Sequence, residues 1–409
     1  MATEQSRTNF DKALKDLYLP RLLATINTGR VLSEHLRRDT TLTDVSGRKA
    51  MVPVNIRPSQ AVGARDGDGT AALPSPQSQT FVGVEIPYAY NYATIRLTHP
   101  VIVSSKNDRG SFVRAVGAEM DGIRRDLKND VNRQWFGDGT GWLGTINTST
   151  GSVTTLTMDP DHRVKVGMVI DSFADKTTGA QQMNSVSVTA VSGNDLTIAS
   201  NAVTNGHFVF REDSRGNEMM GLLGIVENGQ SSNGADGPYA TEIFNVPLST
   251  YPEWRSRVNH NSGTARALTE AIIDDAILDV QEQSEGETDL LISNAKQYRK
   301  AAHLLTGDRR YTPTMQLEGG FTALDWAGIP WVWDRDCPID SGGDAMVFGL
   351  DMDDLMLLQL QDWDFDDTDG SVLHRVSGYN YYDATLFYYG QLGCTAPDDQ
   401  FVIRDLNNS

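Results

Sequence analysis

The chain has 409 residues, enough for two or three domains, and a formal net charge of −19. An acidic balance of this size argues against a dedicated nucleic-acid binder, which would carry a basic domain. No apolar run is long enough for a membrane span, and the N-terminus has no signal segment. Cys337 and Cys394 are the only cysteines, and we expect reduced thiols in a cytosolic product.

The N-terminal segment, residues 10–38, has a helical pattern of leucines that Pro20 interrupts. A second short helical piece is expected over Val31 to Arg38. This segment is interpreted as an arm rather than a domain.

Two strands separated by a polar segment predict a long β-hairpin. From Val82 onward the sequence alternates with the period of two that is typical of a strand. The partner strand is expected at Arg48 to Pro58, and the tip at Ser59 to Gln79, which is rich in Gly, Pro and Ser. The alternating face consists of Val82, Val84, Ile86, Tyr88, Tyr90, Tyr92 and Thr94.

This hairpin is not expected to be stable alone, because a two-stranded ribbon is marginal in water. Pro53, Pro58 and Pro87 also remove donors from the ladder and favour an edge or a free arm. An arm with aromatic residues on one face needs a surface to lie on. The nearest candidate is another copy of the chain.

A long amphipathic helix follows the hairpin. Its apolar residues recur at spacings of three and four, which predicts a single buried stripe. The stripe consists of Phe112, Val116, Met120, Ile123, Leu127, Val131 and Trp135. Asp108 or Ser111 is expected to cap its start, and Gly137 and Gly139 to end it.

Residues 145–211 are rich in Ser, Thr, Val and Gly, and the pattern predicts a small β-barrel or sandwich. The turn Ser192-Gly-Asn-Asp195 is expected to join the last two strands. Because α/β sequence lies on both sides, this segment is interpreted as an inserted module. The expected strands are Ser152–Met158, Val164–Ile170, Ser185–Val191 and Leu196–Ala199.

A second α/β unit is predicted from about Thr250 to Cys337. Thr269 is expected to cap a helix that ends near Gly286. A buried strand is expected at Asp289–Ser293. It is followed by a helix from Asn294 to Leu305, which Gly307 is expected to end. The later expected strands are Phe321–Trp326, Ile329–Trp333, Ala345–Leu350, Leu355–Trp363 and Tyr379–Cys394.

Charge is unevenly spread along the chain. Residues 1–49 carry nine Lys and Arg against six Asp and Glu, and the helix segment 109–133 carries six against four. Residues 340–409 carry two against fourteen, a net of −12. The two mildly basic elements are a weak indication of contact with a polyanion.

No motif predicts a catalytic, cofactor-binding or metal site. The glycines of Gly139-Thr-Gly141-Trp-Leu-Gly144 follow a helix and lead into strands, so a linker is favoured over a dinucleotide loop. In the acidic run from Asp362 to Gly370, Asp367 occupies the glycine position of a calcium loop and Leu373 the position of its Glu. That run is interpreted as a solvated turn, and Asp351-Met-Asp353-Asp354 as a turn or helix start. The seven histidines lack metal-ligand spacing.

The order of arm, long hairpin, long helix, α/β unit and returning strand resembles the major capsid protein of tailed double-stranded-DNA bacteriophages, an α+β chain of the Hong Kong 97-type fold. The local stretches that carry the resemblance are Glu218–Val226, Gly263–Leu268, Gly319–Pro330 and Tyr382–Cys394. They are packing signatures and predict architecture rather than chemistry.

The resemblance implies a division of the chain into named parts. It comprises an N-terminal arm (1–44), an extended hairpin loop (45–98), a peripheral domain with a spine helix (99–141), an inserted β-rich domain (142–218), a return to the peripheral domain (219–262), an axial domain (263–345), peripheral strands (346–396) and a C-terminal tail (397–409).

The resemblance also implies a structural protein, not an enzyme, that self-assembles into the hexamers and pentamers of an icosahedral virion in the host bacterial cytoplasm. Implied partners are other copies of the chain, scaffolding and decoration proteins, a portal at one vertex, and packaged DNA contacted weakly by the arm and spine. No membrane and no cofactor are implied.

Two departures from the family pattern refine this expectation. Some members cross-link through a lysine in the extended loop. In this chain residues 51–105 contain no lysine, and Lys49 lies at the hairpin base. We therefore expect a shell held noncovalently. Some relatives also carry a scaffolding segment at the N-terminus, whereas the arm begins almost at once here, so a separate scaffolding protein or none is expected.

Two other classes remain open at this point. An encapsulin-like nanocompartment would use the same fold to hold enzyme cargo, although the β-rich insert and long hairpin favour a viral shell. An acidic calcium-binding surface or adhesion protein would be a soluble monomer, and the unpaired hairpin argues against it.

Overall fold

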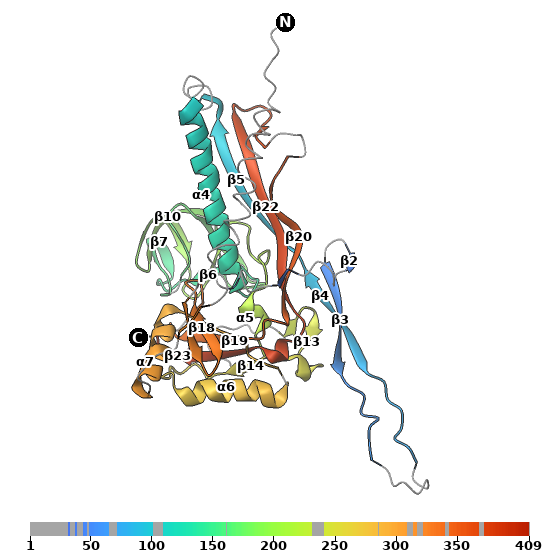
Figure 1. Cartoon of the computed structure of the whole chain (residues 1–409). Coiled ribbons are helices and arrows are strands. Elements are labelled where there is room, and N and C mark those ends of the chain that lie inside the picture. The colour runs from blue at the N-terminus through green and yellow to red at the C-terminus, as the bar shows by residue number, and fades with distance from the viewer. Residues whose placement is uncertain are drawn as a thin grey trace.

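The computed structural model describes residues 32, 37–38, 44–46, 49–64, 72–100, 109–160, 162–230, 241–284, 286–308, 314–316, 322–339, 343–367 and 372–408. Its main parts are two large sheets, a separate β-rich sheet, a long helix and a projecting hairpin (Figure 1).

A mixed seven-stranded sheet has the order β14-β23-β19-β15-β18-β17-β16. Helices α6 (Glu270–Gln283) and α7 (Ala295–Asp308) pack on it, and the Thr269 side chain accepts a hydrogen bond from the Ile272 amide as the expected N-cap. The helix α7 runs through Gly307, which the sequence placed at its end. The strands are β14 (Arg257–Asn259), β15 (Leu290–Ser293), β16 (Thr314–Gln316), β17 (Thr322–Trp326), β18 (Ile329–Trp333), β19 (Ala345–Leu350) and β23 (Phe401–Leu406).

Two of these strands lie in the seven-stranded sheet although the expected domain boundaries placed them outside the axial domain. Residues 397–409 were predicted to be a tail, but β23 lies between β14 and β19, and all six of its residues are buried. Likewise β19 was assigned with the peripheral strands, yet it pairs with β15 and β23. The chain therefore crosses between the two large sheets after β19 and returns after the last long strand.

The second large sheet packs against the long helix α4 (Arg109–Trp135). Its strands are β1 (Arg37–Arg38), β5 (Ala89–Thr98), β20 (Leu355–Phe365), β21 (His374–Arg375) and β22 (Tyr381–Cys394). At 27 residues, α4 is about 40 Å long. It runs beside β5 and β22 in Figure 1. Met120, Leu127, Val131 and Trp135 are buried, which confirms this part of the predicted stripe.

The start of α4 and the end of the arm differ from the elements expected there. Asp108 lies outside the described residues, and Ser111 lies inside the helix, so Ser111 is not its cap. In the arm, Arg37–Arg38 pairs in parallel with Met356–Leu357 as a strand, which contradicts a helix continuing to Arg38. The rest of the arm, apart from Leu32, lies outside the described residues.

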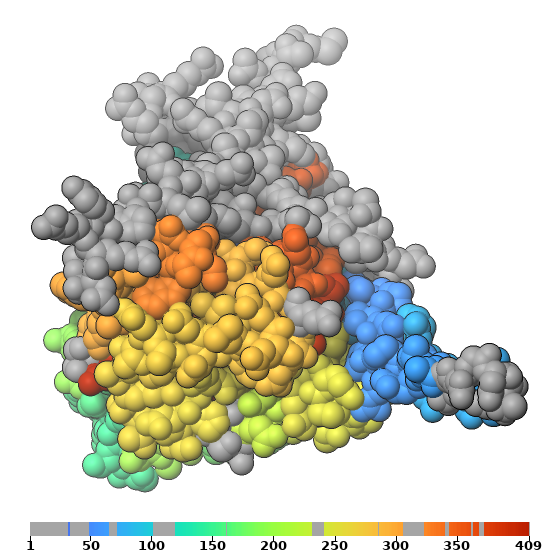
Figure 2. Space-filling view, turned by 60° about the horizontal axis from the view of Figure 1, so that its bottom comes forward, coloured from blue at the N-terminus to red at the C-terminus, as the bar shows by residue number. Residues whose placement is uncertain are grey.

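The hairpin consists of β3 (Lys49–Arg57) and β4 (Thr80–Pro87), with β2 (Asp44–Ser46) added to β3. It leaves the body at an angle and extends past it (Figures 1 and 2). At its base, Ala50, Val52, Val84 and Ile86 are buried in the main core. The predicted ribbon is therefore supported at its base and projects only beyond that point.

The predicted strand from Val82 to Thr94 is two strands in two different sheets. Pairing with β3 ends at Pro87, and pairing of β5 with β22 begins at Ala89. Buried positions shift from even to odd numbers at this point, because Tyr88 and Ala89 are both buried. Tyr90 and Tyr92 consequently do not share the buried face of Val84 and Ile86, and the hairpin loop does not extend to residue 98.

The β-rich segment forms a six-stranded sheet, β6-β11-β8-β9-β10-β7, around its own hydrophobic core. The bridge between Ile146 and Met158 brings the two ends of this sheet together. The predicted turn at residues 192–195 joins β9 to β10, whereas residues 164–168 are not a strand, since β8 begins later. The strands are β6 (Trp142–Thr145), β7 (Gly151–Thr157), β8 (Val169–Phe173), β9 (Gln181–Ser192), β10 (Asp195–Val203) and β11 (Phe208–Arg211).

Short elements complete the connections. They are α5 (Leu222–Ile225), β12 (Glu242–Ile243), β13 (Val246–Pro247), η1 (Pro252–Trp254) and η2 (Pro397–Asp399). In the part of the chain that the structure describes, no helix has the length and apolar character needed to cross a membrane.

Candidate assembly surfaces

The projecting part of the hairpin exposes apolar side chains that a lone molecule would bury. Phe81 is 64% exposed, and Val62 and Leu73 on the two legs of the tip are each 83% exposed. Exposed apolar groups on a projecting arm make the arm a candidate for a protein contact. The hairpin is therefore the first candidate surface.

A salt bridge and a backbone contact fix the direction of the hairpin. Arg57 at the end of β3 donates from Nε and Nη2 to the two carboxylate oxygens of Glu253 in η1, at 2.8 and 3.1 Å. Its Nη2 also donates to the Thr250 carbonyl at 3.0 Å, and its guanidinium lies over the Tyr251 ring. On the other strand, the Glu85 amide donates to the Phe244 carbonyl. These contacts set the angle at which the arm leaves the body.

Electrostatics at this contact favour both charged forms. The hydrogen bond to Glu253 raises the pKa of Arg57, and the same hydrogen bond lowers the pKa of Glu253. Both side chains are nearly half exposed, so the contact orients the arm more than it stabilises the fold.

The second candidate surface is the aromatic face of β5, β22 and the turn that precedes β22, defined by six rings. These are Tyr90, Tyr92, Tyr379, Tyr381, Phe387 and Tyr389. The Tyr389 ring centroid lies 5.0 Å from that of Tyr90, 5.8 Å from that of Tyr92 and 5.4 Å from that of Phe387. Burial and the neighbouring Tyr92 raise the pKa of Tyr389 to about 12.

The opposite face of the same strands packs against α4. Gln134 on α4 donates to Asn91 Oδ1 at 2.8 Å, and Tyr388 is fully buried and stacks on Trp363. Because side chains alternate along a strand, this arrangement directs Tyr90, Tyr92 and Tyr389 away from the helix. Tyr92 is 58% exposed. The sequence missed this face, because the change of sheet at Tyr88 reverses the alternation.

A buried ion-pair network holds the β-rich sheet against α4. Asp130 on α4 accepts from Arg211 of β11 at 2.9 Å and from Arg133 at 3.2 Å, and Arg133 donates to Glu218 at 2.6 Å. Burial acts to raise the pKa of Asp130, but the two guanidiniums outweigh it and lower that pKa. Burial raises the pKa of Glu218 despite Arg133. The network fixes the position of the β-rich sheet on the long helix.

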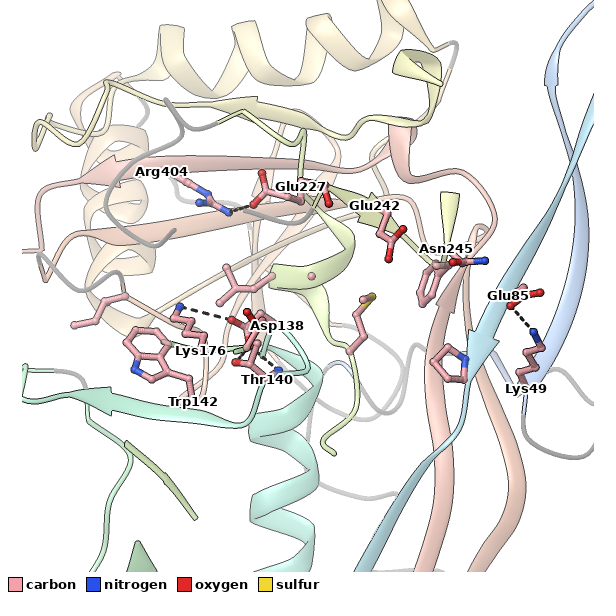
Figure 3. Close-up of a pocket in the computed structure, with 18 residues that line it drawn as sticks. Lys49, Glu85, Asp138, Thr140, Trp142, Lys176, Glu227, Glu242, Asn245 and Arg404 are labelled. Carbon is pink, nitrogen blue, oxygen red and sulfur yellow. Dashed lines mark hydrogen bonds and ion pairs between the residues drawn. The ribbon is translucent and has the colours of Figure 1, made fainter. Parts of the chain in front are cut away.

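A cavity of ≈ 660 Å³ lies between the hairpin base, the end of α4, the β-rich sheet and β23 (Figure 3). Lys176 lies over the Trp142 ring with its Nζ 3.6 Å from Asp138, and Arg404 is 3.3 Å from Glu227. Each of these cations lies beside a carboxylate, so its charge is already partly neutralised within the cavity. The cavity lies where these four parts of the chain meet.

Several motifs that were interpreted as linkers or turns can be located in the structure. The glycine run follows α4 and leads into β6, as expected of a linker. Asp362 to Phe365 belong to β20, so the start of the calcium-like run is a strand rather than a loop, and residues 368–371 lie outside the described residues. Lys49 forms an ion pair with Glu85 across the hairpin base.

No protein-family model and no curated protein sequence matches this chain. Among solved structures, the chain is similar to one in the cyanophage A-1(L) capsid asymmetric unit, with a TM-score of 0.54 and 14% identity over 89% of this chain and 90% of that one. Weaker likenesses are to the SrpI encapsulin of Synechococcus elongatus PCC 7942 (TM-score 0.47, 9% identity, 94% and 89% covered) and the capsid of Myoviridae phage XM1 (0.46, 8%, 92% and 91%).

The cyanophage likeness covers nine-tenths of both chains and defines the class of fold. The chain shares the fold of that capsid chain, which confirms the class of fold that the resemblance in the sequence implied.

Proposed function

We propose that this chain is the structural subunit of an icosahedral shell of hexamers and pentamers that encloses packaged double-stranded DNA. The observation that carries the proposal is the hairpin, which extends past the body with exposed apolar residues at Val62, Leu73 and Phe81. An arm of this kind gains stability on a neighbouring copy. The capsid-type fold supports the same conclusion.

Within this proposal the two large sheets have different places in the shell. The seven-stranded sheet with α6 and α7 is the axial domain at the centre of each hexamer or pentamer. The five-stranded sheet with α4 is the peripheral domain, and the β-rich sheet is a domain inserted between α4 and the return at Met219. The hairpin is the extended loop.

The aromatic face is the proposed landing surface for the hairpin of a neighbouring copy. It offers exposed rings on a rigid sheet, and the hairpin offers exposed apolar groups such as Phe81. Burying both removes apolar area from water, at about 25 cal/mol per Å². The partner of the hairpin is thus another copy of this chain.

Other proposed partners follow from the location in a virion assembled in the bacterial cytoplasm. The mildly basic long helix and arm would contact DNA without sequence specificity. Scaffolding and decoration proteins and a portal at one vertex complete the set. We propose no catalytic role and no cofactor.

Electron microscopy of the purified full-length chain tests the proposal. Closed shells are the expected result, and the Phe81→Ser variant should remain folded but fail to close them. Val166→Ser is the matched control, because Val166 lies on the β-rich segment and is exposed to nearly the same degree, at 61% against 64%. A wild-type chain that stays a monodisperse monomer would overturn the proposal. Particles that hold a protein cargo and no DNA would assign the shell to a nanocompartment instead.

A further inference from the structure

Two chain crossings between the large sheets lie side by side. One crossing joins β19 to β20, and the other joins β22 to β23. The Thr395 amide donates to the Asp354 carbonyl at 3.0 Å, and its hydroxyl donates to Asp354 Oδ1 at 2.8 Å. The Gln400 side chain accepts from the Asp351 amide at 3.0 Å and donates to the Asp351 carbonyl at 3.2 Å. The described connections between β19 and β20 and between β22 and β23 are thus held to each other.

Carboxyl groups from both crossings meet at this point. Oxygens of Asp351, Asp354 and Asp399 lie within 4.8 Å of one another. The backbone of Gly286 closes one side of the cluster, since a Cβ built there would lie 2.4 Å from Asp399 Oδ1. Carboxylates this close repel one another unless one of them holds a proton.

The surroundings supply little positive charge. On the β19–β20 crossing, Asp351 accepts from the amides of Asp353 and Glu287, and Asp289 lies near it. On the other crossing, the neighbours are Asp398 and the buried Cys394 thiol. The Ser284 side chain at the α6 cap lies beside Asp399, and its hydroxyl donates to the Val280 carbonyl at 2.9 Å. Arg257 of β14 is the cation that acts on Asp398.

We propose that the two crossings form a proton-operated hinge, in which a proton shared between Asp354 and Asp399 holds them together and its loss lets them separate. The hinge acts where the chain passes between the two large sheets, so its state sets how tightly the two crossings are held together. This inference does not depend on assembly into a shell.

The pKa values of the cluster support the proposal that loss of a proton separates the crossings. Burial and the neighbouring Asp399 raise the pKa of Asp354 to about 6 from the ordinary 3.8, although the Thr395 hydroxyl acts against the rise. Burial also raises the pKa of Asp351, Asp398 and Asp399. The folded form therefore binds protons more tightly than the unfolded form. The stabilisation is complete below the ordinary pKa and is lost as the pH rises through about 6.

Hydrogen exchange of the full-length chain tests the hinge. The measurement is the opening equilibrium at the Thr395 amide, corrected for the intrinsic pH dependence of exchange and made in EDTA so that no divalent cation replaces the proton. In the wild type, opening should increase by about tenfold or more from acidic to neutral pH. In Asp354→Asn, which places a neutral donor beside Asp399, opening should stay low across the whole range.

Two further variants keep the test decisive. Asp353→Asn removes an exposed charge from the same crossing and should retain the pH-dependent step. Thr395→Val removes the hydroxyl that lowers the Asp354 pKa and should move the pH-dependent step to higher pH. If Asp354→Asn does not fold, this shift tests the proposal in its place. A flat profile in the wild type, or identical profiles for Asp354→Asn and Asp353→Asn, would overturn the proposal. The measurement has the same meaning in monomers and in shells, so it stands apart from the test of shell formation.

Discussion

Arg57 and Glu253 form a two-pronged salt bridge that joins the hairpin to the body, with N–O distances of 2.8 and 3.1 Å. The two residues are 196 positions apart. The bridge stands at the point where β3 ends and the free legs of the hairpin begin. It therefore controls the direction of the arm rather than the stability of the fold.

Replacing Glu253 by Gln should loosen the arm and leave the melting temperature unchanged. The neutral amide cannot provide two charged acceptors to the guanidinium. Hydrogen exchange of the hairpin strands should accelerate, and shells should close more slowly in light scattering. Glu282→Gln, an exposed carboxylate change on α6, is the control and should affect neither measurement. Equal effects of the two changes would refute the role given to the bridge.

Replacing Arg133 by Met should destabilise the chain by about 3–5 kcal/mol, because it removes the guanidinium that pairs with the buried Glu218 and leaves Asp130 with Arg211 alone. Chemical denaturation measures the difference. Arg125→Met, an exposed position on the same helix, should change the free energy of unfolding by less than about 0.5 kcal/mol. A small change in the free energy of unfolding for Arg133→Met would show that the network does not hold the β-rich sheet on α4.

Replacing Gly349 by Ala should prevent or severely weaken packing of the seven-stranded sheet. A Cβ at this position would lie 2.0 Å from the Phe401 ring, and the fully buried ring has no room to move. Gly122→Ala offers the contrast, since nothing lies within 4 Å and the helix gains about 0.5–1 kcal/mol. Thermal unfolding of both variants measures this, and a stable Gly349→Ala chain would contradict the packing described for β23.

The phenol of Tyr389 should ionise later than an ordinary tyrosine. Its pKa is raised to about 12 by burial and by Tyr92, so its contribution to stability is present below the ordinary value of 10 and is lost as the pH rises through about 12. The wild-type minus Tyr389→Phe difference in phenolate absorbance measures this titration. A difference curve centred at the ordinary tyrosine pKa would show that the aromatic face is not packed as described.

Shells of this chain should dissociate into single subunits on a denaturing gel. Lys49 is engaged with Glu85 at the hairpin base, and no lysine lies between residues 51 and 105. Beyond Lys49 at its base, the hairpin therefore has no amine to form an amide link to a neighbour. Ladders of linked subunits from mature particles would contradict a shell held noncovalently.

Features with local causes were predictable from the sequence. The helix α4 follows from apolar residues spaced by three and four, the α6 start follows from Thr269, and the β9–β10 turn follows from Gly193 and Asn194. Each depends on residues within a few positions of one another, so the signal is complete in a short window.

Features that depend on distant partners were decided by the tertiary structure. The pattern from Val82 to Thr94 looks continuous, yet its phase changes where the chain exchanges β3 for β22 as partner. The six residues of β23 show no alternation, because neighbours cover both faces of that strand. Asp354 meets Asp399 only because two crossings converge. The sequence by itself thus determined the elements that have local signals and the class of fold, and the packing of remote segments determined which faces are free and which charges meet.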